Sequence, residues 1–159
     1  TTPYLLDALC LAGRLDMAYT LLFQEKSPSW MSQVNAGATS IWESWEMYQP
    51  DGTPKNASFN HYAFGCVVDW MFRYIGGIDQ KGVGYRHLIF HPQPEGRLTW
   101  AKRSYITEHG LALCNWRRED ETFILEIRVP CNTSATVIMP DATTKHVGSG
   151  HYVFKSSYK

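Results

Sequence analysis

The chain has 159 residues, of which 44% are hydrophobic and 14% aromatic, and its fifteen basic residues balance fifteen acidic ones. This composition excludes a disordered chain, and the length allows one domain or two small ones. The sequence has no net charge, no basic run and no apolar run of the roughly 18 residues that span a bilayer, so we expect neither nucleic acid nor a membrane as a partner.

The first half of the sequence has the periodicity of helices. Apolar residues recur at helical spacing from Leu5 to Ala12, and a second helix is predicted from Arg14 to Glu25, so that the two form a helical hairpin. Residues 61–75 are apolar on nearly every side, which predicts a helix buried all round within a larger helical assembly. Asn60 can cap its start, and Gly76-Gly77 can end it. Trp70 lies in the middle of this segment and is expected to be a core residue.

The second half changes to the periodicity of strands. Alternating, β-branched or aromatic runs predict strands at residues 86–91, 98–107, 111–118, 123–129, 135–139 and 152–154. A series of short strands joined by turns predicts an antiparallel sandwich, whose core Trp100 and Trp116 are expected to fill. The glycine-rich segment 76–84 marks the boundary, so the predicted fold class is α+β, with helices in 1–77 and a sandwich in 78–159.

Neither the cysteines nor the histidines form a recognisable metal site. No Cys-x-x-Cys pair occurs, so free buried thiols are expected at Cys10, Cys66, Cys114 and Cys131. His87 and His91 share a strand face near His109, but no further ligand completes the spacing. We therefore predict no metal and no cofactor. The thiols leave both a cytoplasmic and an exported location open.

The stretch Ile41–Tyr48 is the most informative part of the chain. Two carboxylates, Glu43 and Glu46, lie there among two tryptophans and a tyrosine, and His61 follows Glu43 by 18 residues. Aromatic faces bind the C–H faces of sugars, and carboxylates exchange protons with glycosidic oxygens and water. The mixture predicts a carbohydrate-processing site, or part of one.

Each of these residues also has a structural interpretation. Ser40-x-x-Glu43 is a capping-box pattern, in which Glu43 would only close a helix start. Glu46 would share a helical face with Glu43, and we expect it to be solvated or hydrogen-bonded rather than catalytic. His61 either binds a sugar hydroxyl, orients Glu43, or bonds to backbone in the first turn of a helix. Three tryptophans can line a pocket or fill the core: Trp30, Trp42 and Trp45.

Two motifs carry a family resemblance, which extends over nearly the whole chain. Residues 37–45, Gly-Ala-Thr-Ser-Ile-Trp-Glu-Ser-Trp, and 58–65, Ser-Phe-Asn-His-Tyr-Ala-Phe-Gly, are similar to the C-terminal part of bacterial α-L-rhamnosidases. Those are large inverting glycosidases with a six-hairpin (α/α) barrel. The resemblance implies that 1–77 are the last helices of that barrel and that 78–159 are the C-terminal β-sandwich.

The resemblance also implies roles for residues of both motifs. Glu43 corresponds to the general base and His61 to a histidine that contacts the sugar. Beside these two, Trp45, Trp42 and Asn60 are our further predicted substrate contacts. The family's general acid lies upstream, and no segment here matches its motif. The resemblance implies a terminal α-L-rhamnoside as the substrate. Because the acid is missing, we expect the isolated chain to be inactive.

The predicted helices carry more apolar surface than they can bury against one another. Together with a start that lacks an initiator Met, this predicts that the chain is the end of a larger protein. The expected partner is the rest of the barrel, and the isolated chain is expected to self-associate through the exposed apolar helix surface. Two alternatives stay open: a non-catalytic carbohydrate-binding or scaffold module, and an (α/α)-barrel glycosidase with another sugar.

Overall fold

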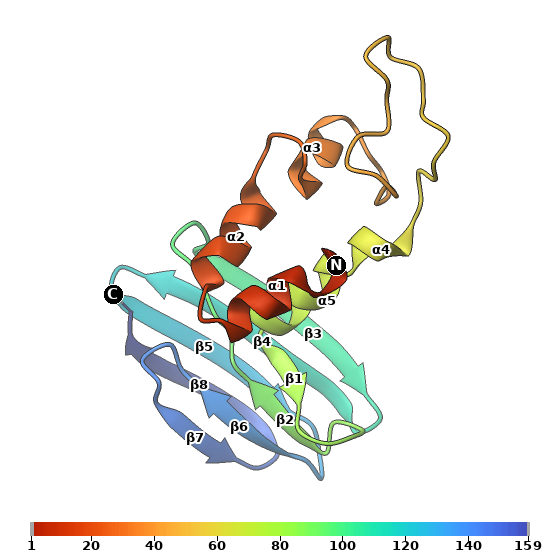
Figure 1. Ribbon diagram of the computed structural model, residues 1–159. Coiled ribbons are helices and arrows are strands. Elements are labelled where there is room, and N and C mark those ends of the chain that lie inside the picture. The colour runs from red at the N-terminus through yellow and green to blue at the C-terminus, as the bar shows by residue number, and fades with distance from the viewer. Residues whose placement is uncertain (1, 159) are drawn as a thin grey trace. The chain divides into compact units, whose positions relative to one another are not determined.

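The computed structural model describes residues 2–158, and the chain divides into two compact units between Trp70 and Met71. The first unit is helical, and the second is built mainly of strands (Figure 1). The division leaves the short helical segment Met71–Ile75, which the sequence assigns to the helical part, with the strands.

The first unit begins with the predicted helical hairpin. α1 (Thr2–Leu11) and α2 (Leu15–Phe23) are joined by a turn in which Gly13 has a φ of 72°. α2 ends before the expected Glu25, because the backbone of Gln24 is already extended. The Gln24 side chain then donates to the carbonyls of Lys26 and Pro28, which stabilises the non-helical course that follows. The short helix α3 (Trp30–Asn35) comes next.

The core of the first unit forms where α1 and α2 meet α5 (Val67–Trp70). Tyr19 and Trp70 are almost fully buried, and their rings meet edge to face with centroids 5.3 Å apart. The indole N–H of Trp70 donates to Sγ of Cys10 over 3.3 Å. The prediction that Trp70 lies in the core is confirmed.

The segment expected to form a single helix over residues 61–75 is helical, but the prediction of one continuous helix is wrong. The chain there forms three short pieces: α4 (Tyr62–Gly65), α5, and a π-helical segment η1 (Met71–Ile75). The residue that caps α4 is His61, not Asn60. Within this chain Tyr62 is 87% exposed and Val68 is 44% exposed, so burial of this segment on all sides within a larger helical assembly stays a prediction. Self-association through such surface stays a prediction.

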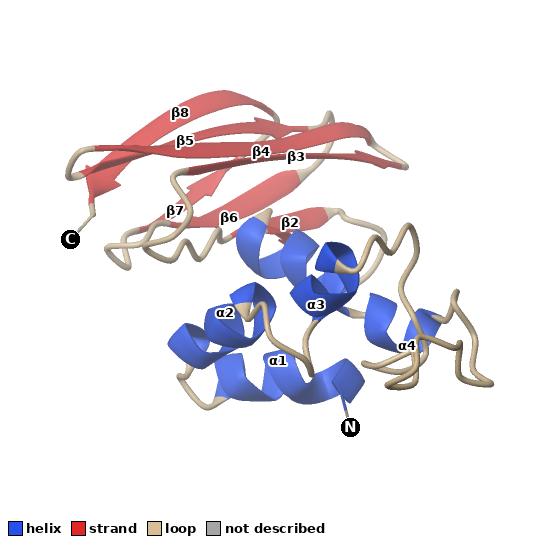
Figure 2. Cartoon of the chain, turned by 90° about the horizontal axis from the view of Figure 1, so that it is seen from above, coloured by secondary structure: helices blue, strands red, loops and turns tan. Residues whose placement is uncertain are grey.

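The second unit consists of two four-stranded sheets, which Figure 2 shows as two layers. One sheet has the order β1 (Ile78–Gln80), β2 (His87–Phe90), β6 (Ser134–Ile138) and β7 (Thr144–Val147). The other has the order β3 (Trp100–Thr107), β4 (Gly110–Glu119), β5 (Thr122–Val129) and β8 (Gly150–Ser157). The predicted combination of a helical hairpin and a sandwich-like pair of sheets is confirmed. One pair departs from the antiparallel expectation, because β2 and β6 run parallel.

Trp116 lies at the centre of the sandwich core, as predicted, and is 2% exposed. Its ring stacks against Phe123 at 5.5 Å, and its indole N–H donates to the carbonyl of Ile75 over 2.7 Å. The same prediction is wrong for Trp100, which is 62% exposed. Ala101 pairs with the inward-facing Trp116, and because side chains alternate along a strand, the preceding Trp100 faces outward.

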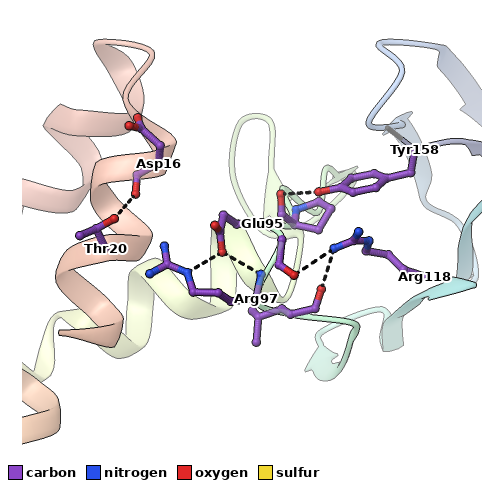
Figure 3. A network of polar contacts seen from close by, with 9 residues as sticks. Asp16, Thr20, Glu95, Arg97, Arg118 and Tyr158 are labelled. Carbon is purple, nitrogen blue, oxygen red and sulfur yellow. Dashed lines mark hydrogen bonds and ion pairs between the residues drawn. The ribbon is translucent and has the colours of Figure 1, made fainter. Parts of the chain in front are cut away.

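Residues 91–99 connect the two sheets, and polar contacts hold them in place (Figure 3). Glu95 accepts from both the backbone N–H and the guanidinium of Arg97, at 3.0 and 2.8 Å. Arg118 donates to two carbonyls of the same connection, and the hydroxyl of Tyr158 donates to a third over 3.2 Å. The connection starts close to Gly77, where any Cβ would lie only 2.6 Å from the backbone nitrogen of Pro92.

The prediction that the cysteines are all buried is wrong in part. Cys114 is buried, and its pKa is raised by burial, whereas Cys131 is exposed and the other two are intermediate. All four thiols are free, as expected.

Because Trp116 both fills the core and donates to a buried carbonyl, Trp116→Phe should lower the free energy of unfolding by about 1–3 kcal/mol, the cost of a buried acceptor left without its donor. Trp100→Phe is the matched control and should change it by less than about 0.5 kcal/mol, as is usual at exposed sites. Urea denaturation followed by tryptophan fluorescence and by circular dichroism measures both. Equal losses for the two variants would contradict the assigned burial.

Candidate functional site

The chain between α3 and α4 is irregular over residues 36–61, yet it folds back on itself (Figure 1). The N–H of Glu43 donates to the carbonyl of Ser58 over 2.9 Å, and the N–H of His61 donates to the carbonyl of Ile41 over 2.8 Å. The two motifs that the sequence singled out are therefore held side by side by backbone hydrogen bonds.

The carboxylate of Glu43 is anchored by one oxygen. Its Oε2 accepts a hydrogen bond of 2.7 Å from the N–H of Ser58, whereas no partner for Oε1 occurs among residues 2–158. The side chain is exposed, so a water molecule can reach Oε1. The capping-box interpretation is wrong, because no helix begins here and the hydroxyl of Ser40 donates instead to the carbonyl of Phe59.

The hydrogen bond to backbone that was expected of His61 is present. Its Nδ1 accepts from the N–H of Ala63 over 3.1 Å and caps α4. Since an accepting Nδ1 carries no proton, the neutral ring carries its proton on Nε2. The backbone role therefore leaves a fixed donor on the other side of the ring, which stacks on Tyr62 with centroids 5.1 Å apart.

Trp45 belongs to an aromatic cluster with Trp30 and Phe64. The rings of Trp45 and Phe64 stack with centroids 3.9 Å apart, and the edge of Trp30 meets Trp45 at 5.1 Å. Trp30 itself is buried, and its indole N–H donates to the carbonyl of Phe64 over 2.8 Å. Trp45 remains half-buried and keeps part of its surface accessible.

Trp42 is more enclosed than Trp45. It is 5% exposed, and it meets the rings of Tyr48 and Phe59 edge to face at 5.8 and 5.6 Å. Asn60, the other expected contact, is exposed, and its N–H donates to the hydroxyl of Ser58.

Glu46 does not share a helical face with Glu43, since this segment is not helical. Its Oε1 accepts from the hydroxyl of Ser27 over 3.1 Å, and its Oε2 lies 3.8 Å from the ammonium of Lys55. The expectation that Glu46 is hydrogen-bonded is confirmed.

Sequence reasoning missed Gln33, which lies directly behind the site. Its side chain is 1% exposed; Oε1 accepts from the N–H of Trp42 over 3.2 Å, and Nε2 donates to the carbonyl of Ser44 over 3.1 Å. The two contacted backbone atoms belong to the residues before and after Glu43. No spacing rule connects a glutamine of α3 to this segment, so the sequence alone contains no signal for it.

A second feature with mixed aromatic and polar lining lies in the strand unit. A hollow of 480 Å³ on the outer face of the β3-β4-β5 sheet is lined by Trp100, Lys102, Asn115 and Glu126, among others. The amide of Asn115 donates to Glu126 over 3.1 Å, and a ring nitrogen of His151 lies 2.8 Å from the same carboxylate. The hydrogen bond from Asn115 and, to a smaller extent, the contact with His151 hold the pKa of Glu126 below its ordinary value.

Within residues 2–158, no group of three or more His, Cys, Asp or Glu side chains is placed to hold a metal ion. The ring of His87, one of the histidines considered above, instead makes 2.8 Å contacts with the hydroxyls of Ser134 and Thr136. None of the helices in the same residues has the length and apolar character to cross a membrane.

Two family models match the chain. The bacterial alpha-L-rhamnosidase 6 hairpin glycosidase domain matches residues 1–75, and the bacterial alpha-L-rhamnosidase C-terminal domain matches residues 77–154. An alpha-L-rhamnosidase of Streptomyces avermitilis is 40% identical over 156 residues, which cover 96% of this chain. One from Formosa agariphila is 39% identical over 142 residues, or 87% of this chain. The chain spans about 15% of the length of each of these relatives.

Solved structures agree with the sequence matches. Streptomyces avermitilis alpha-L-rhamnosidase complexed with L-rhamnose superposes with a TM-score of 0.93 at 36% identity, over 98% of this chain and 17% of that one. The native enzyme of Aspergillus terreus gives a TM-score of 0.92 at 34% identity, over 97% of this chain and 18% of that one. With both of its units matched in this way, the chain belongs to the bacterial α-L-rhamnosidase family.

Proposed function

We propose that the chain is the C-terminal part of a glycoside hydrolase that releases terminal α-L-rhamnose from glycosides with inversion, and that Glu43 is its general base. The observation that carries the proposal is the carboxylate of Glu43, which is anchored through Oε2 and open at Oε1. The similarity to the Streptomyces avermitilis enzyme, whose solved structure contains L-rhamnose, supports the sugar.

The geometry suits a base that acts on water. Inversion needs one carboxylate to deprotonate a water on one face of the sugar and a separate acid to protonate the leaving oxygen, with roughly 6.5–9.5 Å between the two. Glu43 supplies the first group. The exposed Glu46 is paired with Lys55 and Ser27. Within the two motifs, residues 37–45 and 58–65, Glu43 is the one carboxylate, so the motifs do not supply the acid. The acid then comes from the longer protein that carries this chain.

The neighbouring residues bind the sugar in this proposal. His61 donates from Nε2 to a sugar hydroxyl, because its Nδ1 is occupied by the N–H of Ala63. Trp45 and Asn60, which are partly or fully exposed, provide the other contacts. For Trp42 the burial of the ring favours support of Glu43 over contact with the sugar.

In the longer enzyme, Glu43→Gln should lower kcat by roughly 10²–10⁴-fold and leave KM nearly unchanged, because a general base acts mainly in the transition state. Glu46→Gln is the matched control and should cost much less, since its partners are Ser27 and Lys55. Both are measured on one aryl α-L-rhamnoside at several pH values. A severe Glu46 variant beside a mild Glu43 variant would show that the base is misassigned.

The isolated 159-residue chain should not hydrolyse an aryl α-L-rhamnoside, because inverting chemistry needs both carboxylates. Release of the aryl group above the buffer rate measures this. Turnover that survives purification and disappears in Glu43→Ala would contradict the assignment of the acid to another part of the protein.

The hollow beside Trp100 favours a second candidate function, carbohydrate binding without chemistry by the strand unit. An exposed indole face next to an amide, a carboxylate and an ammonium group offers both the apolar and the hydrogen-bonding contacts that a sugar ring needs. This function is compatible with catalysis elsewhere in the protein.

If the hollow binds sugar, Trp100→Ala should abolish the retardation of the chain in gels that contain a rhamnose-rich polysaccharide, since the stacking face is lost. Tyr4→Ala is the matched control, because Tyr4 is an exposed aromatic residue of the other unit at 77% exposure. Retardation that is absent in the unmodified chain, or is equal in all three proteins, would exclude this function.

A further inference from the structure

We infer that Gln33 is a positioning residue, which holds Glu43 in place through backbone atoms of the residues before and after it. The inference rests on the proposed function of Glu43 as general base. Gln33 accepts from the N–H of Trp42 and donates to the carbonyl of Ser44, so its single amide fixes the backbone before and after Glu43.

The contacts of Gln33 and Ser58 hold the same short segment in complementary ways. The N–H of Glu43 itself donates to Ser58, and Ser58 returns a hydrogen bond to the carboxylate. Gln33 contacts backbone atoms that Ser58 leaves unused, the N–H of the preceding residue Trp42 and the carbonyl of the following residue Ser44. Without the amide of Gln33, the segment would be held by Ser58 at Glu43 and by His61 at the carbonyl of Ile41. The backbone of Ser44 would lose its contact with Gln33, and its rotation would move the carboxylate.

The helix that carries Gln33 is itself anchored. The hydroxyl of the buried Ser29 accepts from the N–H of Ser32 over 2.9 Å at the start of α3. The indole of Trp30 donates to the carbonyl of Phe64 in α4. Gln33 therefore extends from a fixed support, as a positioning residue requires.

Only an amide side chain matches both contacts. The N–H of Trp42 needs an acceptor and the carbonyl of Ser44 needs a donor, and the two ends of a carboxamide supply one of each. A glutamine buried for stability alone would require only that its own polar atoms be satisfied by any groups. Here both partners adjoin the same exposed carboxylate, which points to a role in catalysis.

The test is a double-mutant cycle in the longer enzyme. Gln33→Met keeps the length of the side chain but removes both hydrogen bonds, and should lower kcat by about 10–10²-fold with KM nearly unchanged, because a displaced base loses its reach to the water. In a Glu43→Gln background the same substitution should change the residual kcat little, because no base remains to be positioned.

Two further variants separate positioning from general damage. Gln24→Met is the matched control: it removes a glutamine of the same unit whose amide donates to the carbonyls of Lys26 and Pro28, and neither of these residues is a hydrogen-bond partner of Glu43. It should leave kcat within about twofold, because surface substitutions away from the site usually have small effects. Gln33→Glu retains an acceptor for the N–H of Trp42 and should lower kcat less than Gln33→Met does. If Gln33→Met does not fold, Gln33→Glu takes its place in the double-mutant cycle.

The outcomes are distinguishable. If Gln33→Met lowers kcat by the same factor with and without Glu43, its effect does not pass through the base and the inference is wrong. A Gln33→Met variant with unchanged kcat overturns it equally. If Glu43→Gln itself proves mild, the proposed function fails first, and the inference falls with it.

Discussion

The backbone pairing of Glu43 with Ser58 determines the arrangement of the site, because a stretch without helix or sheet must still satisfy its N–H and C=O groups. Here backbone groups of the two motifs pair with each other, and the backbone N–H of His61 also donates to the carbonyl of Ile41. The chain between them closes as a short hairpin, in which the backbone N–H of Lys55 donates to the carbonyl of Met47 over 2.8 Å. A loop built in this way can hold a functional carboxylate while remaining irregular.

Aromatic packing keeps this loop on the helices. Trp42 and Met47 are buried, and the stacked rings of Trp45 and Phe64 connect the loop to α4. Because aromatic side chains bury much area with few rotatable bonds, they fix a loop at a low cost in conformational entropy. The density of tryptophan that first suggested a sugar site therefore also has a structural cause. In this chain Trp42 serves that structural role, and Trp45 serves it while keeping accessible surface.

The sequence was most informative where one periodicity dominates. The helical hairpin and the long strands β3, β4 and β5 could be predicted because their apolar residues repeat at one fixed interval. β7 could not, since its four residues lie at an exposed edge and lack an apolar face. Trp100 was misplaced because a shift of one residue in register turns a side chain to the opposite face. Gln33 was missed because contacts from a side chain to distant backbone leave no trace in spacing.

The exposure of Glu43 follows from what its proposed chemistry requires. A base that acts on water must face an acid across the width of a sugar ring, so both carboxylates line an open space rather than a packed core. A chain that spans about 15% of its relatives would, under the proposed function, contribute one wall of that space. The other wall would come from helices outside this chain, which would also cover apolar side chains such as Tyr62. Under the proposed function, the exposed apolar helices and the exposed, anchored carboxylate would have one common cause, a barrel whose remaining helices complete both the core and the site.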